Sequence, residues 1–225
     1  MSSLPNPLPD AEAQCRQLAD LIRPQLSKNP ALVGIYSGGA WIAERLKELL
    51  GLTEEVGLID VSFYRDDFSE KGLHPQCRPT VIPFDVEGRH IILVDDVLYT
   101  GRTTRAAINE LFDYGRPAAV ELAVLADRGG RELPVAATYG TWDVALDAGQ
   151  SLGLARVLDA DAPRLVTLAA QRHNIAADID QCIAHAARAQ QGGRAVERVA
   201  LGIAAQVELH GGVATAQAMA AGRPG

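Results

Sequence analysis

The sequence predicts an α/β fold with a mainly parallel central sheet flanked by helices. Short apolar runs of strand length alternate with amphipathic helical segments along residues 10–126, the pattern of successive strand–helix units. The runs 31–36, 89–94 and 118–126 are apolar almost without interruption, as expected for parallel strands buried on both faces. With 225 residues, 48% of them hydrophobic, the chain can bury the core of one ordinary domain and carry an appendage.

Helices are expected where apolar residues recur three and four positions apart between capping and stop residues. Asp10 can cap the first helix, and Pro24 should end or kink it. Gly51 closes the second helix, whereas Gly115 and Pro117 stop the third. These signals predict helices from residue 11 towards residue 24, over 41–50 and over 103–114.

Further strands are expected outside the three buried runs. Residues 56–63 and 80–86 have strand length and composition, and a tight turn at 87–89 leads into the central strand. Beyond residue 140 the pattern weakens, although 152–158 and 164–168 can pair as a hairpin. The sheet therefore accounts for most of the first two thirds of the chain.

Two segments do not fit this alternation. Residues 65–79 are polar, contain proline and glycine and show no period, a length that is uncommon for a loop unless it covers a site. An ordinary surface connection is the alternative. After residue 171 the chain becomes alanine-rich, with two amphipathic helices expected around a break at Gly192-Gly193. We therefore divide the chain into a domain at 1–170 and a helical extension at 171–225, which either packs on that domain or mediates oligomerisation.

Composition limits the class of protein. The net charge is −7 and no lysine- or arginine-rich run occurs, which disfavours long-range steering towards nucleic acid but leaves a local basic patch open. The first residues lack the features of a secretory signal, and the longest apolar runs are far too short to span a bilayer. The three cysteines are widely spaced, so neither a disulfide framework nor a zinc site is predicted. A cytoplasmic protein without membrane contact is expected.

The segment 91–104 carries the chemistry. A buried parallel strand leads to Asp95 and Asp96, and ligands of open α/β sheets bind outside the carboxyl ends of the strands. Two adjacent buried acids need hydroxyls, a metal or a cation as partners. Gly101 then lets the backbone approach an anion, and donors surround it from the loop, the helix N-terminus and three threonines, Thr100, Thr103 and Thr104. A sugar with neighbouring hydroxyls and a 5-phosphate fits these groups; an Asp-Asp turn before a threonine-rich helix start is the plain structural alternative.

The stretch 94–105 resembles the phosphoribosyl pyrophosphate signature of type I phosphoribosyltransferases. More narrowly, it is similar to the PyrR family, bacterial regulators of pyrimidine operons that are also uracil phosphoribosyltransferases. Residues 63–67, 113–117 and 122–134 share this resemblance, which extends from about residue 10 to about residue 170. It implies the type I phosphoribosyltransferase fold for residues 1–170.

The resemblance also implies a reaction, in which uracil and phosphoribosyl pyrophosphate give UMP and pyrophosphate with Mg²⁺ bound to the substrate. Asp95 and Asp96 would contact the ribose hydroxyls and balance positive charge that grows on the sugar. Arg65 is a candidate pyrophosphate contact at the start of a closing loop. No side chain is predicted to bind the metal directly. The residues that would hold the 5-phosphate are Thr100, Gly101, Arg102, Thr103 and Thr104.

Two further parts of the site follow from the same resemblance. Ser37, Gly38 and Gly39 occupy the position of the pyrophosphate loop, where many members carry Thr-Arg-Gly. Gly38 replaces the arginine, so backbone amides can still bind an anion but a charged, bidentate donor is missing. Arg128 and Tyr139 are candidates for the base pocket, and Trp142, three residues after Tyr139, is an alternative aromatic candidate. Arg128 and Arg131 could instead form structural ion pairs.

A second function remains open at this point. The family includes members that bind pyrimidine-leader RNA, so the chain could be a regulator that senses UMP or UTP through the same pocket with weak or no catalysis. The resemblance also implies a homo-oligomer. None of the five histidines shows a metal-ligand spacing.

Overall fold

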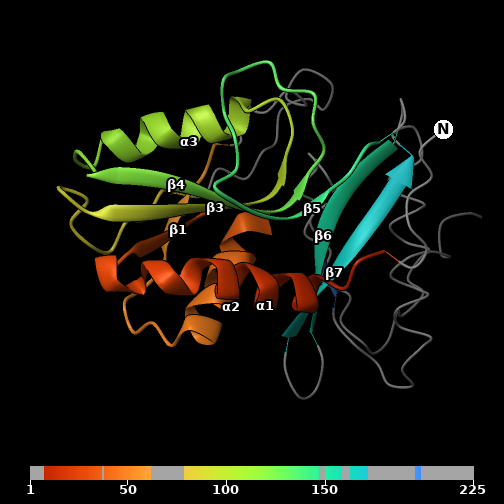
Figure 1. Ribbon diagram of the computed structural model, residues 1–225, viewed down its shortest axis with the longest axis horizontal. Coiled ribbons are helices and arrows are strands. Elements are labelled where there is room, and N and C mark those ends of the chain that lie inside the picture. The colour runs from red at the N-terminus through yellow and green to blue at the C-terminus, as the bar shows by residue number, and fades with distance from the viewer. Residues whose placement is uncertain are drawn as a thin grey trace, which may run out of the picture.

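Five parallel strands form the central sheet, in the order β2-β1-β3-β4-β5 (Figure 1). The computed structural model describes residues 8–36, 38–61, 79–146, 150–158, 163–171 and 196–198. The strands of this sheet are β1 (Ala31–Ile35), β2 (Gly57–Ile59), β3 (His90–Leu98), β4 (Ala119–Asp127) and β5 (Tyr139–Asp143). The predicted α/β fold with a parallel sheet is therefore confirmed.

Helices cover both faces of the sheet (Figure 1). α3 lies on one face, and α1 and α2 lie on the other. Alternate residues of β3 separate the two halves of the core, since Ile92 and Val94 pack towards α1 and α2 while Ile91 and Leu93 pack towards α3. The helices are α1 (Ala11–Ile22), α2 (Gly38–Leu50) and α3 (Arg102–Phe112), and a 3₁₀ helix, η1 (Arg23–Lys28), follows α1.

The ends of the helices follow the capping signals in the sequence. The Asp10 carboxylate accepts a hydrogen bond from the Ala13 N–H at 2.8 Å, which begins α1 as expected. Pro24 stands in the first turn of η1, so the helix tightens there rather than ending abruptly. Gly51 adopts a φ of 68° directly after α2, the left-handed conformation that closes a helix.

Three predicted boundaries were wrong. The expected strand over 80–86 is reduced to one antiparallel bridge between Val81 and Leu58, because Pro83 has no N–H to extend the ladder. β3 does not stop at residue 94 but runs on to Leu98, so the acid pair lies within the strand. α2 begins at Gly38, three residues before the predicted start, because the glycine turn is its first turn. The end of the strand predicted over 56–63 lies partly outside the described residues.

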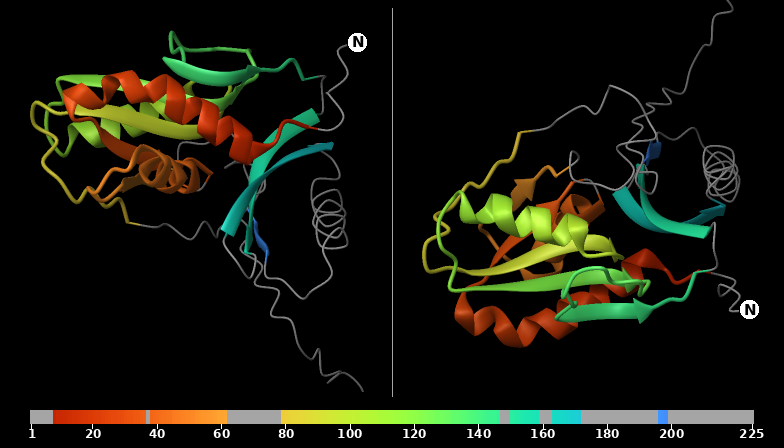
Figure 2. Two further views of the ribbon diagram at one scale, coloured as in Figure 1. Left: turned by 60° about the horizontal axis from the view of Figure 1, so that its bottom comes forward. Right: turned by 90° about the horizontal axis from the view of Figure 1, so that it is seen from above.

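A second, three-stranded sheet in the order β7-β6-β8 follows the domain core (Figure 2). β6 (Gln150–Leu158) and β7 (Pro163–Gln171) pair antiparallel, so the predicted hairpin is confirmed. β8 (Val196–Arg198) pairs antiparallel with β6, so the second helix predicted for the extension is wrong at these residues. The remainder of that helix, and the first one, lie outside the described residues. Within the described part of the chain, no helix is both long enough and apolar enough to cross a membrane.

Candidate active site

The candidate site lies where the carboxyl ends of β1, β3 and β4 meet. β1 leads into the glycines that start α2, β3 leads into α3, and β4 leads into a loop over Asp127–Val135, called here the 127–135 loop. Neighbouring parallel strands place these three connections along one edge of the sheet. This edge is where open α/β sheets bind ligands.

Asp95 and Asp96 are both buried, at 4% and 8% exposure. The Asp95 Oδ1 atom accepts a hydrogen bond from the Asp96 N–H at 3.0 Å, and the Asp96 Oδ1 atom accepts one from the Val97 N–H at 2.9 Å. Each carboxylate therefore leans along the strand towards its carboxyl end. Because successive side chains on a strand point to opposite faces, Asp96 lies on the α2 side and Asp95 is directed to the α3 side.

The two glycines that begin α2 pack directly on the acid pair. A Cβ atom at Gly38 would stand 2.5 Å from Asp96 Oδ2, and one at Gly39 would overlap the Val94 carbonyl oxygen. Gly39 has no room for a side chain, because the atoms in its way belong to the β3 backbone, whereas a side chain at Gly38 would have to displace the Asp96 carboxylate. The structure thus brings Gly38 and Gly39 together with Asp96, whereas Ser37 lies outside the described residues.

The loop after β3 has the shape of an anion site. Gly101 has a φ of 90° and precedes α3, and its carbonyl oxygen accepts the first helical hydrogen bond, from the Arg105 N–H at 2.9 Å. The Thr100 Oγ1 atom accepts a hydrogen bond from the Arg102 N–H at 3.3 Å, and a hydroxyl that accepts one bond can still donate another. The α3 N-terminus and the loop amides supply donors at the same place.

The side chains of the loop 100–104 differ in their exposure and in their partners. Thr100 and Thr104 are buried, at 6% and 1% exposure, while Thr103 is half-buried. Arg102 is half-exposed and forms an ion pair in which its Nε and Nη2 atoms lie 2.8 and 2.6 Å from Glu132 Oε2. The five predicted phosphate-loop residues are thus adjacent, but the Arg102 guanidinium is directed to the 127–135 loop.

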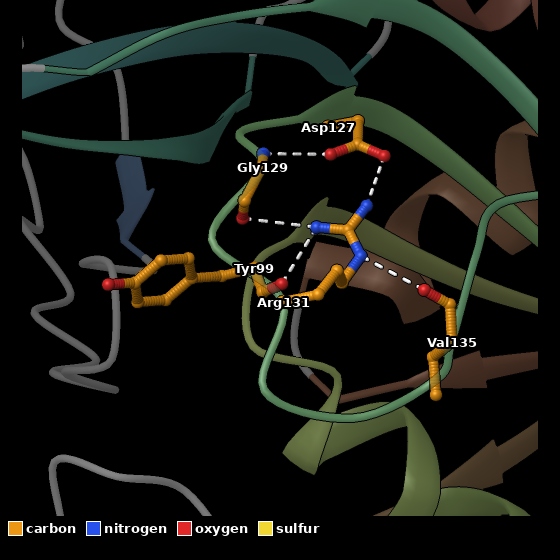
Figure 3. A network of polar contacts seen from close by, with 5 residues as sticks. All are labelled: Tyr99, Asp127, Gly129, Arg131 and Val135. Carbon is orange, nitrogen blue, oxygen red and sulfur yellow. Dashed lines mark hydrogen bonds and ion pairs between the residues drawn. The ribbon is translucent and has the colours of Figure 1, made fainter.

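The 127–135 loop holds the start of the phosphate loop. Arg131 forms an ion pair with Asp127 and donates hydrogen bonds to carbonyl oxygens of Tyr99, Gly129 and Val135 (Figure 3). Of the two alternatives for Arg131, the structural ion pair is therefore the one observed. The sequence prediction allowed for this ion pair but missed the hydrogen bonds of Arg131 to backbone carbonyl oxygens.

Arg128 and Tyr139, the two base-pocket candidates, lie in different places. The Arg128 guanidinium stacks over the Tyr99 ring, with its Cζ atom 3.9 Å from the ring centroid, beside the candidate site. Tyr139 is paired with Ala123 in the middle of β4, and its hydroxyl donates to Glu121. The structure therefore does not bring Tyr139 to the edge that carries the acid pair. Burial and the Glu121 carboxylate raise the pKa of the Tyr139 hydroxyl.

Trp142, the other aromatic candidate, is closer to the site. It lies three residues further along β5 and lines the same pocket as Asp96 and Val97. Its neighbour in register is Ala126, next to the end of β4. Of the aromatic candidates, Trp142 is therefore the one that shares a pocket with Asp96, while Arg65 lies outside the described residues.

The acid pair suits a magnesium ion that arrives with its substrate. Carboxylate oxygens are the ligands that Mg²⁺ prefers, and the ion commonly takes only one or two of them from the protein and the rest from phosphates and water. The described residues hold no group of three or more acidic, histidine or cysteine side chains placed to bind a metal. Asp95 and Asp96 therefore fit a substrate-bound ion rather than a dedicated protein cage.

Comparisons with known proteins identify the family of the chain. Residues 6–148 match the phosphoribosyl transferase domain family. The chain is 58% identical over 149 residues to the Bifunctional protein PyrR of Ralstonia nicotianae, covering 64% of this chain and 85% of that protein. It is 56% identical over 137 residues to the protein of the same name from Pseudomonas paraeruginosa, covering 59% and 78%. A solved structure of the HGPRT-ase from Leishmania tarentolae in complex with GMP is also similar, with a TM-score of 0.48 and 19% identity over 63% of this chain and 78% of that one. The chain therefore belongs to the phosphoribosyltransferase family and, within it, to the PyrR proteins.

Proposed function

We propose that this chain transfers the phosphoribosyl group of phosphoribosyl pyrophosphate to uracil, giving UMP and pyrophosphate. The observation that carries the proposal is the meeting of three parts at one sheet edge: the buried acid pair, the loop 100–104 and the glycines that start α2. These parts match the ribose, the 5-phosphate and the pyrophosphate of the substrate. The choice of uracil rests on the PyrR relatives and on the family resemblance.

The acid pair would act on the sugar. Asp95 and Asp96 would accept hydrogen bonds from the ribose hydroxyls and stabilise positive charge that develops on the sugar as the pyrophosphate leaves. Their burial increases that stabilisation, because charges interact more strongly where water is excluded. When bound, Mg²⁺ would neutralise the pyrophosphate charge and orient it against the ribose.

The loop 100–104 would anchor the 5-phosphate and so fix the sugar in place. Charge-assisted hydrogen bonds contribute about 1.5–3 kcal/mol each. Four or five of them are enough for micromolar binding, about −8 kcal/mol, after the ordering costs are subtracted. Gly38 and Gly39 would offer backbone amides to the pyrophosphate, with Arg65 as the candidate cationic contact. Positioning, rather than a covalent intermediate, would supply most of the catalysis.

One assay tests the proposal. The full-length protein is incubated with Mg²⁺, phosphoribosyl pyrophosphate and each nucleobase in turn, and the mononucleotides are separated by chromatography. UMP is expected from uracil, and little or no product is expected from the purines. A mononucleotide formed from a purine base would show that the protein is not specific for uracil. Absence of a mononucleotide with every base would refute the proposed reaction.

A second function is favoured by two observations. The relatives are named bifunctional, and Gly38 leaves the pyrophosphate loop without the arginine that many members carry. We propose as the alternative that the chain senses UMP or UTP and binds pyrimidine-leader RNA, with weak or no catalysis. Binding to such RNA that depends on UMP and falls steeply with salt concentration would support this alternative, and weak, salt-independent binding would dismiss it.

A further inference from the structure

The 127–135 loop holds two peptide groups at the start of the phosphate loop. The Tyr99 carbonyl oxygen accepts a hydrogen bond from Arg131 Nη1 at 2.7 Å (Figure 3). The Thr100 carbonyl oxygen accepts hydrogen bonds from the N–H groups of Glu132 and Leu133 at 3.0 and 3.1 Å. Both carbonyls are therefore turned towards the 127–135 loop.

The direction of a carbonyl determines the direction of the next N–H. In a planar trans peptide, the C=O of one residue and the N–H of the next point in opposite directions. The N–H groups of Thr100 and Gly101 are consequently directed away from the 127–135 loop. That loop follows β4, whereas Gly38 follows β1 on the other side of β3. The two N–H groups are thus turned from the 127–135 loop, to the side where the 5-phosphate is proposed to bind.

We propose that Arg131 is a positioning residue for the 5-phosphate, which it would serve by holding the Tyr99–Thr100 peptide with its N–H towards the ligand. The inference rests on the proposed function, because it assigns the phosphate to the loop 100–104. Turned the other way, this peptide would present a carbonyl oxygen to the phosphate, and two acceptors repel each other. Arg131 would not touch the substrate and would act through Thr100.

The contacts of Arg131 explain why an arginine is needed. Its Nε atom donates to the Val135 carbonyl at 3.0 Å, its Nη1 atom donates to Tyr99 and to Gly129 at 2.7 and 3.1 Å, and its Nη2 atom pairs with Asp127. Only the planar guanidinium carries enough donors in a fixed fork for such a set of acceptors. A lysine could keep the ion pair with Asp127 but not the remaining bonds together.

The Tyr99 side chain is held by the same loop. The Arg128 guanidinium stacks on its ring, and a Cβ atom at Gly130 would stand 2.6 Å from the ring Cε2 atom. Gly129 and Gly130 both have φ near +70°, 68° and 69°, which allows the chain to turn under the ring. The 127–135 loop therefore fixes both the backbone and the side chain of Tyr99.

The test compares ligands that differ only in the 5-phosphate. The affinities of UMP and of uridine are measured by equilibrium dialysis for the wild-type protein, Arg131→Met and Arg131→Lys. Labelled UMP is the reporter, and unlabelled uridine competes with it. In Arg131→Met the affinity for UMP should fall about tenfold, the value of one charge-assisted hydrogen bond, while the affinity for uridine stays unchanged. A general loss of structure would weaken both ligands together.

Arg89→Met is the matched control. Arg89 is as buried as Arg131, at 24% against 23% side-chain exposure, and it also forms an ion pair, with Glu54 at 2.5 Å, but before β3 begins. This variant should keep the preference for UMP over uridine. If Arg131→Met does not fold, Arg131→Lys decides, since it should recover the melting temperature but not the preference.

The outcomes separate this inference from the proposed function. Arg131→Met or Arg131→Lys with the full wild-type preference for UMP would overturn the positioning role and leave the reaction untouched. A wild-type protein that binds uridine as well as UMP would overturn the assignment of the phosphate loop itself, and the proposed function with it. The inference is supported if the Arg131 variants lose affinity for UMP but not for uridine, and Arg89→Met loses neither.

Discussion

Gly38 lies directly against the side chain of Asp96. A Cβ atom at residue 38 would stand 2.5 Å from Asp96 Oδ2 and 2.6 Å from its Cγ atom. A side chain at residue 38 would therefore require the Asp96 carboxylate to move. In this arrangement a side chain at residue 38 and the observed conformation of Asp96 exclude each other.

The first prediction concerns this contact. Gly38→Ala, and more strongly Gly38→Arg, should displace the Asp96 carboxylate and lower kcat/KM for phosphoribosyl pyrophosphate, by about tenfold or more if one charge-assisted contact to the ribose is lost. Gly140→Ala is the matched control, because nothing but two methyl carbons at 3.9 Å approaches a Cβ atom there. A Gly38→Arg variant with higher turnover than the wild type would show that the observed position of the Asp96 carboxylate does not matter for catalysis.

Asp96→Asn should lower turnover at least about tenfold without unfolding the protein, because the amide keeps the shape but loses the charge that stabilises the sugar. Its Oδ1 atom can still accept the hydrogen bond from the Val97 N–H, which is 2.9 Å long in the wild type. Asp85→Asn is a control, since Asp85 also accepts from a backbone N–H, that of Glu87 at 3.0 Å, outside the site. Steady-state kinetics and a melting curve measure both effects, and an Asp96→Asn enzyme with full activity would remove Asp96 from the site.

Thr100→Val should raise the KM for phosphoribosyl pyrophosphate and cut turnover at least about tenfold, because it removes a buried hydroxyl from the proposed phosphate site. The hydroxyl also accepts the Arg102 N–H at 3.3 Å. Thr138→Val deletes a hydroxyl that accepts the Leu122 N–H at the same 3.3 Å, but at the start of β5. Equal kinetic effects of the two substitutions would show that the Thr100 hydroxyl has no part in binding.

The Tyr139–Glu121 contact should stabilise the fold in a pH-dependent way. Burial acts to raise the pKa of the Glu121 carboxyl, but the hydrogen bond from Tyr139 and the charge of His90 outweigh it, so the pKa is lowered. A carboxyl with a lowered pKa contributes stability above its unfolded pKa of about 4.3, and that stability is lost as the pH falls through its folded value. Tyr139→Phe should therefore cost about 1.5 kcal/mol at pH 7 and progressively less below about pH 4.5.

Urea unfolding at several pH values measures this difference. Tyr114→Phe serves as the control, since the Tyr114 side chain is exposed and its hydroxyl donates a long hydrogen bond, 3.4 Å, to the Thr80 carbonyl oxygen. Its effect should be small and the same at each pH. A Tyr139→Phe penalty that grows as the pH is lowered would have the wrong sign for a hydrogen bond to the Glu121 carboxylate.

Removal of residues 172–225 should leave UMP formation intact. The family match ends at residue 148, and the candidate site lies within β1 to β5. The truncation keeps β7 whole but removes β8, which pairs with β6. Activity and molecular size are measured together by kinetics and analytical ultracentrifugation. An inactive but folded truncation of smaller mass would show that the extension maintains an assembly on which the site depends.

Much of the fold could be predicted because its signals are local. β1, β3 and β4 are apolar along most of their length. Asp10 caps α1 with its own carboxylate, and Gly51 can adopt the left-handed conformation after α2 because it has no side chain. β5 was not predicted, since Tyr139–Asp143 includes glycine and polar residues on a strand that is only partly buried. Its position depends on pairing with β4, which is a tertiary contact.

The candidate site shows the same division. The acid pair and the Gly/Thr loop are contiguous in sequence, so their proximity follows from the chain itself. The approach of Gly38 to Asp96 joins residues 58 positions apart, and the acceptors of Arg131 are mostly backbone carbonyls, which no sequence pattern displays. Tyr139 was chosen for its aromatic ring, but its position in register directs its hydroxyl to Glu121.

A crystal structure of the full-length protein with UMP tests the central claim most directly. The 5-phosphate is predicted to lie against the backbone N–H groups of residues 100–104, with the ribose hydroxyls within hydrogen-bonding distance of Asp95 or Asp96. UMP bound elsewhere, with the loop after β3 empty, would contradict the assignment of this sheet edge as the active site.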